Sequence, residues 1–141
     1  MNGKTASRIM LTLLLISTLA AISTTVHALD HDVAVTDVKT FKSLCGLTLS
    51  PFNIVYENYT VSINATVENQ GSNSETFNVT AKYDSTVIQK ITDVSLDPLE
   101  NATVTFTWNT TGVAKGNYTL TVVAELDGDE ESGDNTYTYI P

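Results

Sequence analysis

Apolar and polar residues alternate along much of the chain, and this two-residue period restricts the fold more than any other feature of the sequence. It is clearest at 59–67, 77–83 and 103–108, where every second residue is apolar. Successive side chains of a β-strand point to opposite faces of a sheet, so each row would form one buried face. The same segments lack the spacing of an amphipathic helix. The sequence therefore predicts an all-β domain of half-buried strands.

Turn-forming residues divide the alternating rows into about seven short strands. Asn69-Gln70-Gly71 and Asp84-Ser85 favour tight turns, and Pro98 fixes a corner in the loop 96–101. Residues 41–57 are expected to form a long connection with one short extended piece. This pattern indicates an antiparallel β-sandwich, with a small barrel as the alternative. The expected strands are 33–38 with a local shift in its alternation, 59–67, 77–83, 87–91, 103–108, 118–124 and 136–140.

The first 28 residues have the build of a secretory signal peptide, expected to be helical. Lys4 and Arg8 give a positive start, and residues 9–22 form an apolar run that is short for a transmembrane helix. Small residues in Val26-His27-Ala28 suit a signal peptidase, so cleavage is expected after Ala28. An uncleaved N-terminal anchor is the alternative.

Cleavage would leave residues 29–141 as one domain, which is 113 of the 141 residues. No anchor is expected after the last strand, because the sequence ends there without a second apolar segment. We therefore expect a protein that is secreted or displayed at the cell surface, and whose mature chain does not insert into a membrane.

The mature domain would be strongly acidic. Loss of Lys4 and Arg8 changes the formal net charge from −9 to −11. A negative field of this size repels nucleic-acid phosphates and anionic lipids, so neither is an expected partner. Cationic ligands, including Ca²⁺, remain open.

Few residues suit catalysis. After cleavage the sequence keeps a single histidine, His31, and its single cysteine is Cys45. It has neither a glycine-rich phosphate loop nor a Cys/His cluster with metal-ligand spacing. Cys45 could be a buried small hydrophobe, an intermolecular bridge or a nucleophile. We expect a protein that is not an enzyme and carries no cofactor, apart from the calcium considered below.

Six Asn-x-Thr sequons, none with proline in the middle, are the strongest chemical signal. Asn64 and Asn78 alternate with inward residues and should therefore point outward, where a glycan can be attached. The other four fall at strand ends or turns. The sequence predicts N-glycosylation in an archaeal or eukaryotic host at Asn58, Asn64, Asn78, Asn101, Asn109 and Asn117.

Residues 127–135 form an acidic loop before the last expected strand. Clustered carboxylates can supply the oxygen ligands that Ca²⁺ prefers. The spacing is not that of an EF-hand, and a solvated turn is the alternative interpretation. The possible calcium ligands are Asp127, Asp129, Glu131 and Asp134.

Three segments, in this order and spacing, carry a family resemblance: 61–71 with its Val-Glu-Asn-Gln-Gly ending, 103–108 ending in Trp108, and 116–122 with Gly-Asn-Tyr. Together they resemble the CARDB module, the cell-adhesion-related domain of bacterial and archaeal surface proteins. The resemblance implies an immunoglobulin-like sandwich in a secreted or surface-displayed protein, without a catalytic site. The sequence departs from it where Leu99 replaces an expected glycine.

Two aromatic residues are interpreted as structural. Trp108 lies on an inward position by parity, so a core role is favoured over a ligand platform. Tyr118 opens the expected strand 118–124 and is similar to the tyrosine corner of immunoglobulin-type sandwiches, in which the hydroxyl bonds to the chain upstream.

The first functional hypothesis is a non-enzymatic extracellular interaction module that binds a protein or a glycan through loops or a sheet edge. The second is a structural subunit that self-associates in an envelope or filament, for example by exchanging the extended segment 29–39. A third is an accessory or inhibitor protein for an exported enzyme.

Overall fold

The computed structural model describes residues 29–44, 47–49 and 55–140. The predicted signal peptide, residues 1–28, lies outside the described residues, as does Cys45. Eight strands form two four-stranded sheets, ordered β2-β1-β3-β6 and β5-β4-β7-β8, in which all pairings are antiparallel. The strands are β1 (Val33–Leu44), β2 (Leu47–Leu49), β3 (Thr60–Asn69), β4 (Glu75–Tyr83), β5 (Thr86–Leu96), β6 (Asn101–Asn109), β7 (Leu120–Glu125) and β8 (Thr136–Tyr139).

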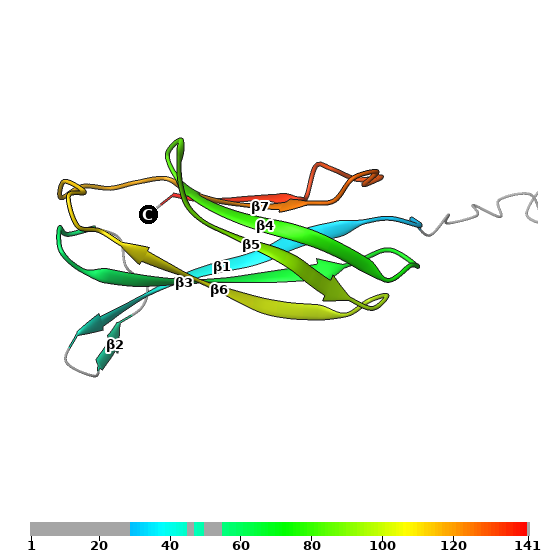
Figure 1. The fold of residues 1–141 in the computed structure, drawn as a ribbon, viewed down its shortest axis with the longest axis horizontal. Helices are drawn as coiled ribbons and strands as arrows, with labels where there is room; N and C mark the ends of the chain where they lie inside the picture. Colours follow the sequence, from blue (N-terminus) through cyan, green and yellow to red (C-terminus); the bar gives the residue numbers. More distant parts are fainter. Residues whose placement is uncertain (1–28, 45–46, 50–54, 141) are drawn as a thin grey trace, which may run out of the picture.

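The two sheets pack face to face, with their strands along the long axis of the molecule (Figure 1). The predicted all-β antiparallel sandwich is confirmed, and two separate sheets exclude the small barrel. The alternating rows supply the core between the sheets, because every second residue of β3 and β6 is buried. The largest fully buried apolar side chains are Phe106, Ile63, Val33, Val61, Val67, Val79 and Val122.

An aromatic cluster fills one end of the core. Trp108 is 3% exposed and stacks on Tyr83 with ring centroids 4.7 Å apart, while Tyr118 meets the Trp108 ring edge-on at 5.9 Å. The Tyr118 hydroxyl donates to the carbonyl of Ala114 at 2.8 Å, which is an upstream contact like that of a tyrosine corner. Tyr118 lies two residues before β7 rather than inside the strand.

The connection expected at 41–57 starts later than predicted, because β1 continues into it, and the short extended piece expected there corresponds to β2. β1 continues to Leu44, and within this extension Lys42 pairs with Val61 of β3. β2 then pairs antiparallel with the last residues of β1. Val55 forms a bridge with Gly116. The extension escaped prediction because the polar residues Lys39, Thr40 and Lys42 interrupt the apolar alternation, while the long β3 still offers backbone partners.

The strand expected at 87–91 spans Thr86–Leu96 in the structure. Its pairing with β4 shifts register twice, between Phe77 and Val79 and between Ala81 and Lys82. Each bulge displaces the inward side by one residue, so inward positions recur about every third residue and the two-residue period disappears. The shift predicted within 33–38 is confirmed as an irregularity between Val35 and Asp37.

Candidate functional site

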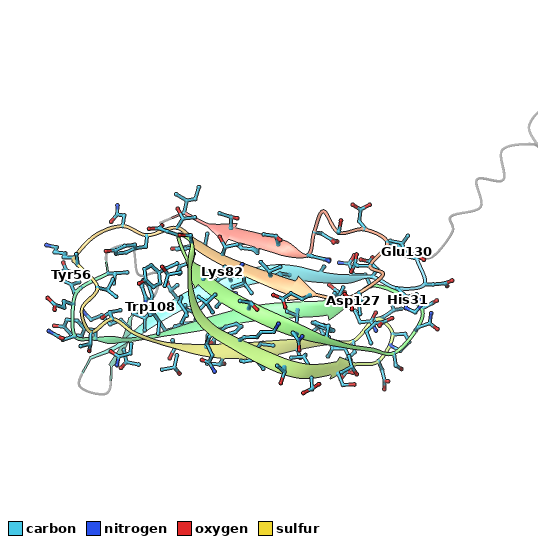
Figure 2. All side chains as sticks on the ribbon, turned by 45° about the horizontal axis from the view of Figure 1, so that its top comes forward. His31, Tyr56, Lys82, Trp108, Asp127 and Glu130 are labelled. Atoms are coloured by element: carbon cyan, nitrogen blue, oxygen red, sulfur yellow. The ribbon has the colours of Figure 1, made fainter. Side chains whose placement is uncertain are left out.

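Two segments distant in sequence meet at one end of the sandwich. They are residues 29–32, which enter β1, and residues 126–135, which connect β7 to β8. Glu130 N donates to the carbonyl of His31 at 2.9 Å. Figure 2 places His31, Asp127 and Glu130 together at this end, opposite Tyr56. We call this region the acidic end and define it by Asp30, Asp32, Asp129, Glu130, Glu131 and Asp134.

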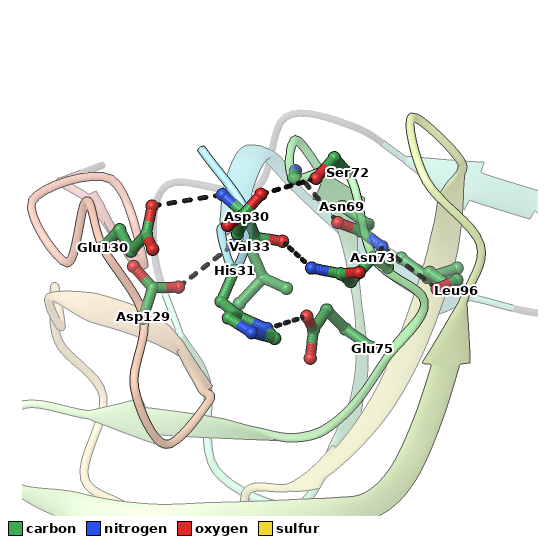
Figure 3. A network of polar contacts seen from close by, with 11 residues as sticks. Asp30, His31, Val33, Asn69, Ser72, Asn73, Glu75, Leu96, Asp129 and Glu130 are labelled. Atoms are coloured by element: carbon green, nitrogen blue, oxygen red, sulfur yellow. Dashed lines mark hydrogen bonds and ion pairs between the residues drawn. The ribbon is translucent and has the colours of Figure 1, made fainter. Parts of the chain in front are cut away.

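Two carboxylates of the loop hold the entering segment by its backbone. Asp129 Oδ2 accepts a hydrogen bond from Val33 N at 3.0 Å, and its Oδ1 accepts one from Glu131 N at 3.0 Å. Glu130 Oε2 accepts from Asp30 N at 3.1 Å (Figure 3). Charged acceptors make stronger hydrogen bonds than neutral ones. Asp129 and Glu130 therefore join the start of β1 to the β7–β8 loop.

On its other side, the entering segment rests on the β3–β4 turn. The carbonyl of Asp32 accepts hydrogen bonds from Gln70 N and Gly71 N at 2.9 and 3.2 Å. The backbones approach so closely that a Cβ on Gly71 would lie 2.7 Å from the carbonyl oxygen of Asp30. Glycine at position 71 is therefore required by packing.

The same turn is organised by a buried amide. Asn69 is fully buried, and its Nδ2 donates to the carbonyls of Asn73 at 2.7 Å and Leu96 at 3.1 Å. Its Oδ1 accepts from Gly71 N at 3.0 Å (Figure 3). The sequence indicated only a turn here, whereas the side chain of Asn69 bonds to two backbone groups of the turn and to one at the end of β5.

His31 makes the one ion pair that the structure shows at this end within the described residues. Its Nδ1 lies 2.6 Å from Oε1 of Glu75, whose side chain is 8% exposed. The hydrogen bond to Glu75 raises the pKa of His31 above its ordinary 6.5. Protonated His31 therefore compensates the charge of a buried carboxylate.

Three side-chain oxygens at the acidic end are buried without a hydrogen-bond partner. They are Asp32 Oδ1, Asp134 Oδ1 and Asn135 Oδ1. Burial, followed by the neighbouring carboxylates led by Asp134, raises the pKa of Asp32 to about 6. Burial also raises the pKa of Asp134. The group therefore has an excess of acceptors and of negative charge.

The four predicted calcium ligands do not come together as one set. Asp127 lines an open hollow with Asn78 and Asp93, while both oxygens of Asp129 accept backbone N–H groups. Glu131 is exposed. Within the described residues, no three His, Cys, Asp or Glu side chains form a metal-binding group.

Asp32, the most buried carboxylate of this end, was missed by sequence reasoning. It is 2% exposed and directly precedes Val33, the first residue of β1. A single aspartate beside an apolar strand resembles an ordinary strand boundary. No signal in the sequence relates it to Asp134, because their proximity depends on how the starts of β1 and β8 come together.

The sequon asparagines all lie at the surface. Asn58, Asn101, Asn109 and Asn117 are exposed, and Asn64 and Asn78 are half-buried on the outward positions of β3 and β4. Asn109 Oδ1 accepts hydrogen bonds from both N and Oγ1 of Thr111, at 3.0 and 2.8 Å. The asparagine and the threonine of this sequon are therefore bonded to each other.

A second feature missed by sequence reasoning lies at the opposite end. Lys42 Nζ sits 3.7 Å from the ring centroid of Tyr59, and Lys115 Nζ sits 4.8 Å from that of Tyr56. Both tyrosines remain more than one-third exposed. These cation–π contacts hold the 55–59 segment against β1 and the 110–119 loop.

In the described part of the chain, no helix has the length and hydrophobicity of a membrane span. None of the curated proteins compared with the chain matches it. Among solved structures, one domain of a candidate cell surface protein from Methanosarcina acetivorans is similar, with 27% identity and a TM-score of 0.58. The alignment covers 79% of this chain and 90% of that one.

The CARDB domain of PF1109 from Pyrococcus furiosus, solved by NMR, shows the same fold with a TM-score of 0.58 at 20% identity, covering 79% of this chain and 93% of that one. Its crystal structure, in complex with di-metal ions, gives 0.52 at 20% identity, over 74% and 85% of the two chains. In sequence, residues 47–137 match the CARDB family model, which is more than half of the chain. The chain therefore belongs to the CARDB family.

Proposed function

We propose that this protein is an exported, N-glycosylated module of the cell surface that binds an extracellular protein or glycan and performs no catalysis. The observation that carries the proposal is the match of residues 47–137 to CARDB, a non-catalytic, adhesion-type module. The likeness to a domain of a candidate archaeal cell surface protein supports it. The signal peptide predicted at 1–28 supplies the route of export.

The distribution of sequons supports glycosylation of one sheet in particular. Asn101 and Asn109 lie at the two ends of β6, Asn64 lies within the adjacent β3, and Asn58 lies just before β3. Asn58, Asn101 and Asn109 are exposed, and Asn64 is half-buried on an outward position. Glycans at these positions would cover the outer face of the β2-β1-β3-β6 sheet.

The other sheet carries two sequons, at Asn78 of β4 and at Asn117, three residues before β7. Its edge strand β5 carries no sequon, so the outer edge of that strand would remain accessible. A strand edge offers backbone hydrogen bonds to a partner. We therefore place the partner on the β5 side.

Cell fractionation tests export. The full chain, with a C-terminal tag, would be produced in an archaeal host that glycosylates its envelope proteins. We expect the protein in the medium or the envelope, starting at Leu29 and heavier than its polypeptide. A cytosolic protein that starts at Met1 would contradict the proposal.

Mass spectrometry of sequon variants tests glycosylation. Thr66→Ala removes the Asn64 sequon without replacing the asparagine, and the mass should fall by one glycan. Thr86→Ala, at an exposed threonine outside any sequon, should leave the glycan mass unchanged. Equal masses of wild type and Thr66→Ala, beyond the replaced side chain, would exclude a glycan on Asn64.

Cell-binding assays test the partner face. Arginine at Thr92, exposed on β5, should weaken binding to host cells, because it places a long charged side chain on the proposed contact. Arginine at Thr107, exposed on β6, should leave binding intact. The opposite ranking of these two variants would move the partner to the sheet that carries more sequons.

A further inference from the structure

We propose that Asp32, Asp134 and Asn135 bind a calcium ion that fastens the start of β1 to the β7–β8 loop. The site goes beyond the proposed function, since export and glycosylation do not require it. Its basis is the three buried oxygens that lack a hydrogen-bond partner. Buried polar atoms without partners are rare in folded proteins, and each calls for a ligand or another explanation.

The nearby backbone donors are already used. Val33 N binds Asp129, Val35 N binds the carbonyl of Asp134 at 3.0 Å, and Gln70 N binds the carbonyl of Asp32. These bonds position both segments but leave Asp32 Oδ1 and Asp134 Oδ1 without a donor. The protein itself therefore does not satisfy the group.

In the described part of the chain, the structure shows no lysine paired with Asp32 or Asp134. Lys39 pairs with Asp37, and Lys90 pairs with Glu125. Around the two central carboxylates stand Asp129, Glu130 and Glu131, which add to the negative potential. A cation would remove the repulsion and the cost of burying unpaired charge at once.

The donor set selects among cations. Asp32, Asp134 and Asn135 present oxygen alone, which disfavours zinc, a metal that takes nitrogen and sulfur ligands in most protein sites. Ca²⁺ accepts carboxylate, amide and water oxygens in irregular geometry, whereas Mg²⁺ demands near-ideal octahedral coordination. Two carboxylates and one amide leave several positions to water. Such a site would be weak, with a dissociation constant of roughly 10⁻⁴–10⁻³ M, as in other extracellular modules.

Thermal unfolding of the purified protein tests the proposal, after removal of metals with EDTA and at pH 7.5. Addition of about 5 mM CaCl₂ should raise Tm by roughly 5 °C, because a ligand that binds only the folded state stabilises it. MgCl₂ at the same concentration should give a smaller rise. The absence of any rise with CaCl₂ would overturn the proposal, leaving a proton or water at the group.

Substitutions assign the response to the site. Asp32→Asn should abolish the rise with CaCl₂ and, in EDTA, should raise Tm above that of the wild type, since it removes a buried charge. Asp84→Asn is the matched control. Asp84 accepts a hydrogen bond from Thr119 N at 3.1 Å beyond the opposite end of β4, and asparagine keeps that acceptor. The rise in Tm of Asp84→Asn with CaCl₂ should equal that of the wild type. An equal loss of this rise in both variants would show that calcium acts by general screening of the negative surface charge, and would overturn the proposal.

A second measurement does not depend on the folding of Asp32→Asn. Addition of CaCl₂ to the ¹⁵N-labelled wild type should shift backbone amide signals within 31–36 and 129–136 and leave those of 81–85 in place. Asp134→Asn should remove the shifts. Shifts spread over the whole acidic surface, or centred on Asp127, would refute the assignment to Asp32, Asp134 and Asn135.

Discussion

His31 Nδ1 lies 2.6 Å from Oε1 of Glu75, and this contact links the segment before β1 to the first residue of β4. The two residues are 44 positions apart in the sequence. The pair belongs to the polar network that holds the acidic end together, and it makes part of the stability dependent on pH.

Replacement of His31 by Gln should flatten the pH dependence of unfolding. The pKa of His31 is raised in the folded protein, chiefly by the hydrogen bond to Glu75. The contribution of His31 to the stability of the fold is therefore fully present below about pH 6.5, its pKa in the unfolded chain. This contribution is lost as the pH rises through the raised pKa of the folded protein. Urea midpoints of both proteins at pH 5.5, 6.5 and 8 measure it.

The difference between the two proteins should be largest at pH 5.5 and smallest at pH 8. Asp32 also contributes stability that is lost as the pH rises through its folded pKa of about 6. Because Asp32 is present in both proteins, its contribution cancels in the difference between them. A difference that is constant across the three pH values would show that the stabilisation by His31 does not depend on its protonation.

Replacement of Asn69 by Ala should destabilise the fold by about 3 kcal/mol. The change leaves the carbonyl of Asn73, the buried carbonyl of Leu96 and the buried N–H of Gly71 without their partner. Denaturant unfolding measures the loss. Asn73→Ala, which removes one exposed hydrogen bond to Asp30, should cost less than about 1 kcal/mol. Equal costs would mean that Asn69 is merely a turn residue.

Replacement of Gly71 by Ala should cost about 1–3 kcal/mol, because the new Cβ meets backbone that cannot rotate away. Gly116→Ala serves as the control. There the nearest atom to a Cβ is a Tyr118 ring carbon at 3.5 Å, an ordinary contact. Its free energy of unfolding should change by less than about 0.5 kcal/mol. An unchanged free energy of unfolding for Gly71→Ala would show that residues 30–32 do not pack closely against the β3–β4 turn.

Replacement of Leu99 by Gly should stabilise the protein by about 0.5–1 kcal/mol. Leu99 follows Pro98 in the turn closed by Glu100 N donating to the carbonyl of Asp97, and its φ is 62°. That conformation is strained for a branched residue and free for glycine, and the side chain, 74% exposed, has little packing to lose. A lower Tm for the variant would show that Leu99 packs against something in solution.

The central strands were predictable because their residues obey one period. Ile63 and Phe106 pair with each other across β3 and β6, which run in unbroken register, so parity alone assigns them to the core. β5 was only partly predictable, because the bulges in its pairing with β4 remove the two-residue period from its sequence. Local pattern identifies a strand only where the ladder is regular.

The acidic end was predictable in its composition but not in its geometry. The loop 127–135 is visibly acidic, yet Asp127 lies apart beside Asn78, while Asp134 lies near Asp32. The second half of the site comes from residues 29–32, about a hundred positions earlier. Contacts between such distant segments depend on sheet order, which a single sequence does not specify.

The order of the strands also has a mechanical consequence. β1 starts at the acidic end, whereas β8 runs from that end toward the opposite one (Figure 1). A pulling force between Leu29 and Ile140 would therefore draw β1 lengthwise along β3, to which it is bonded over nine residue pairs. Those bonds would share the load and break together rather than open one by one.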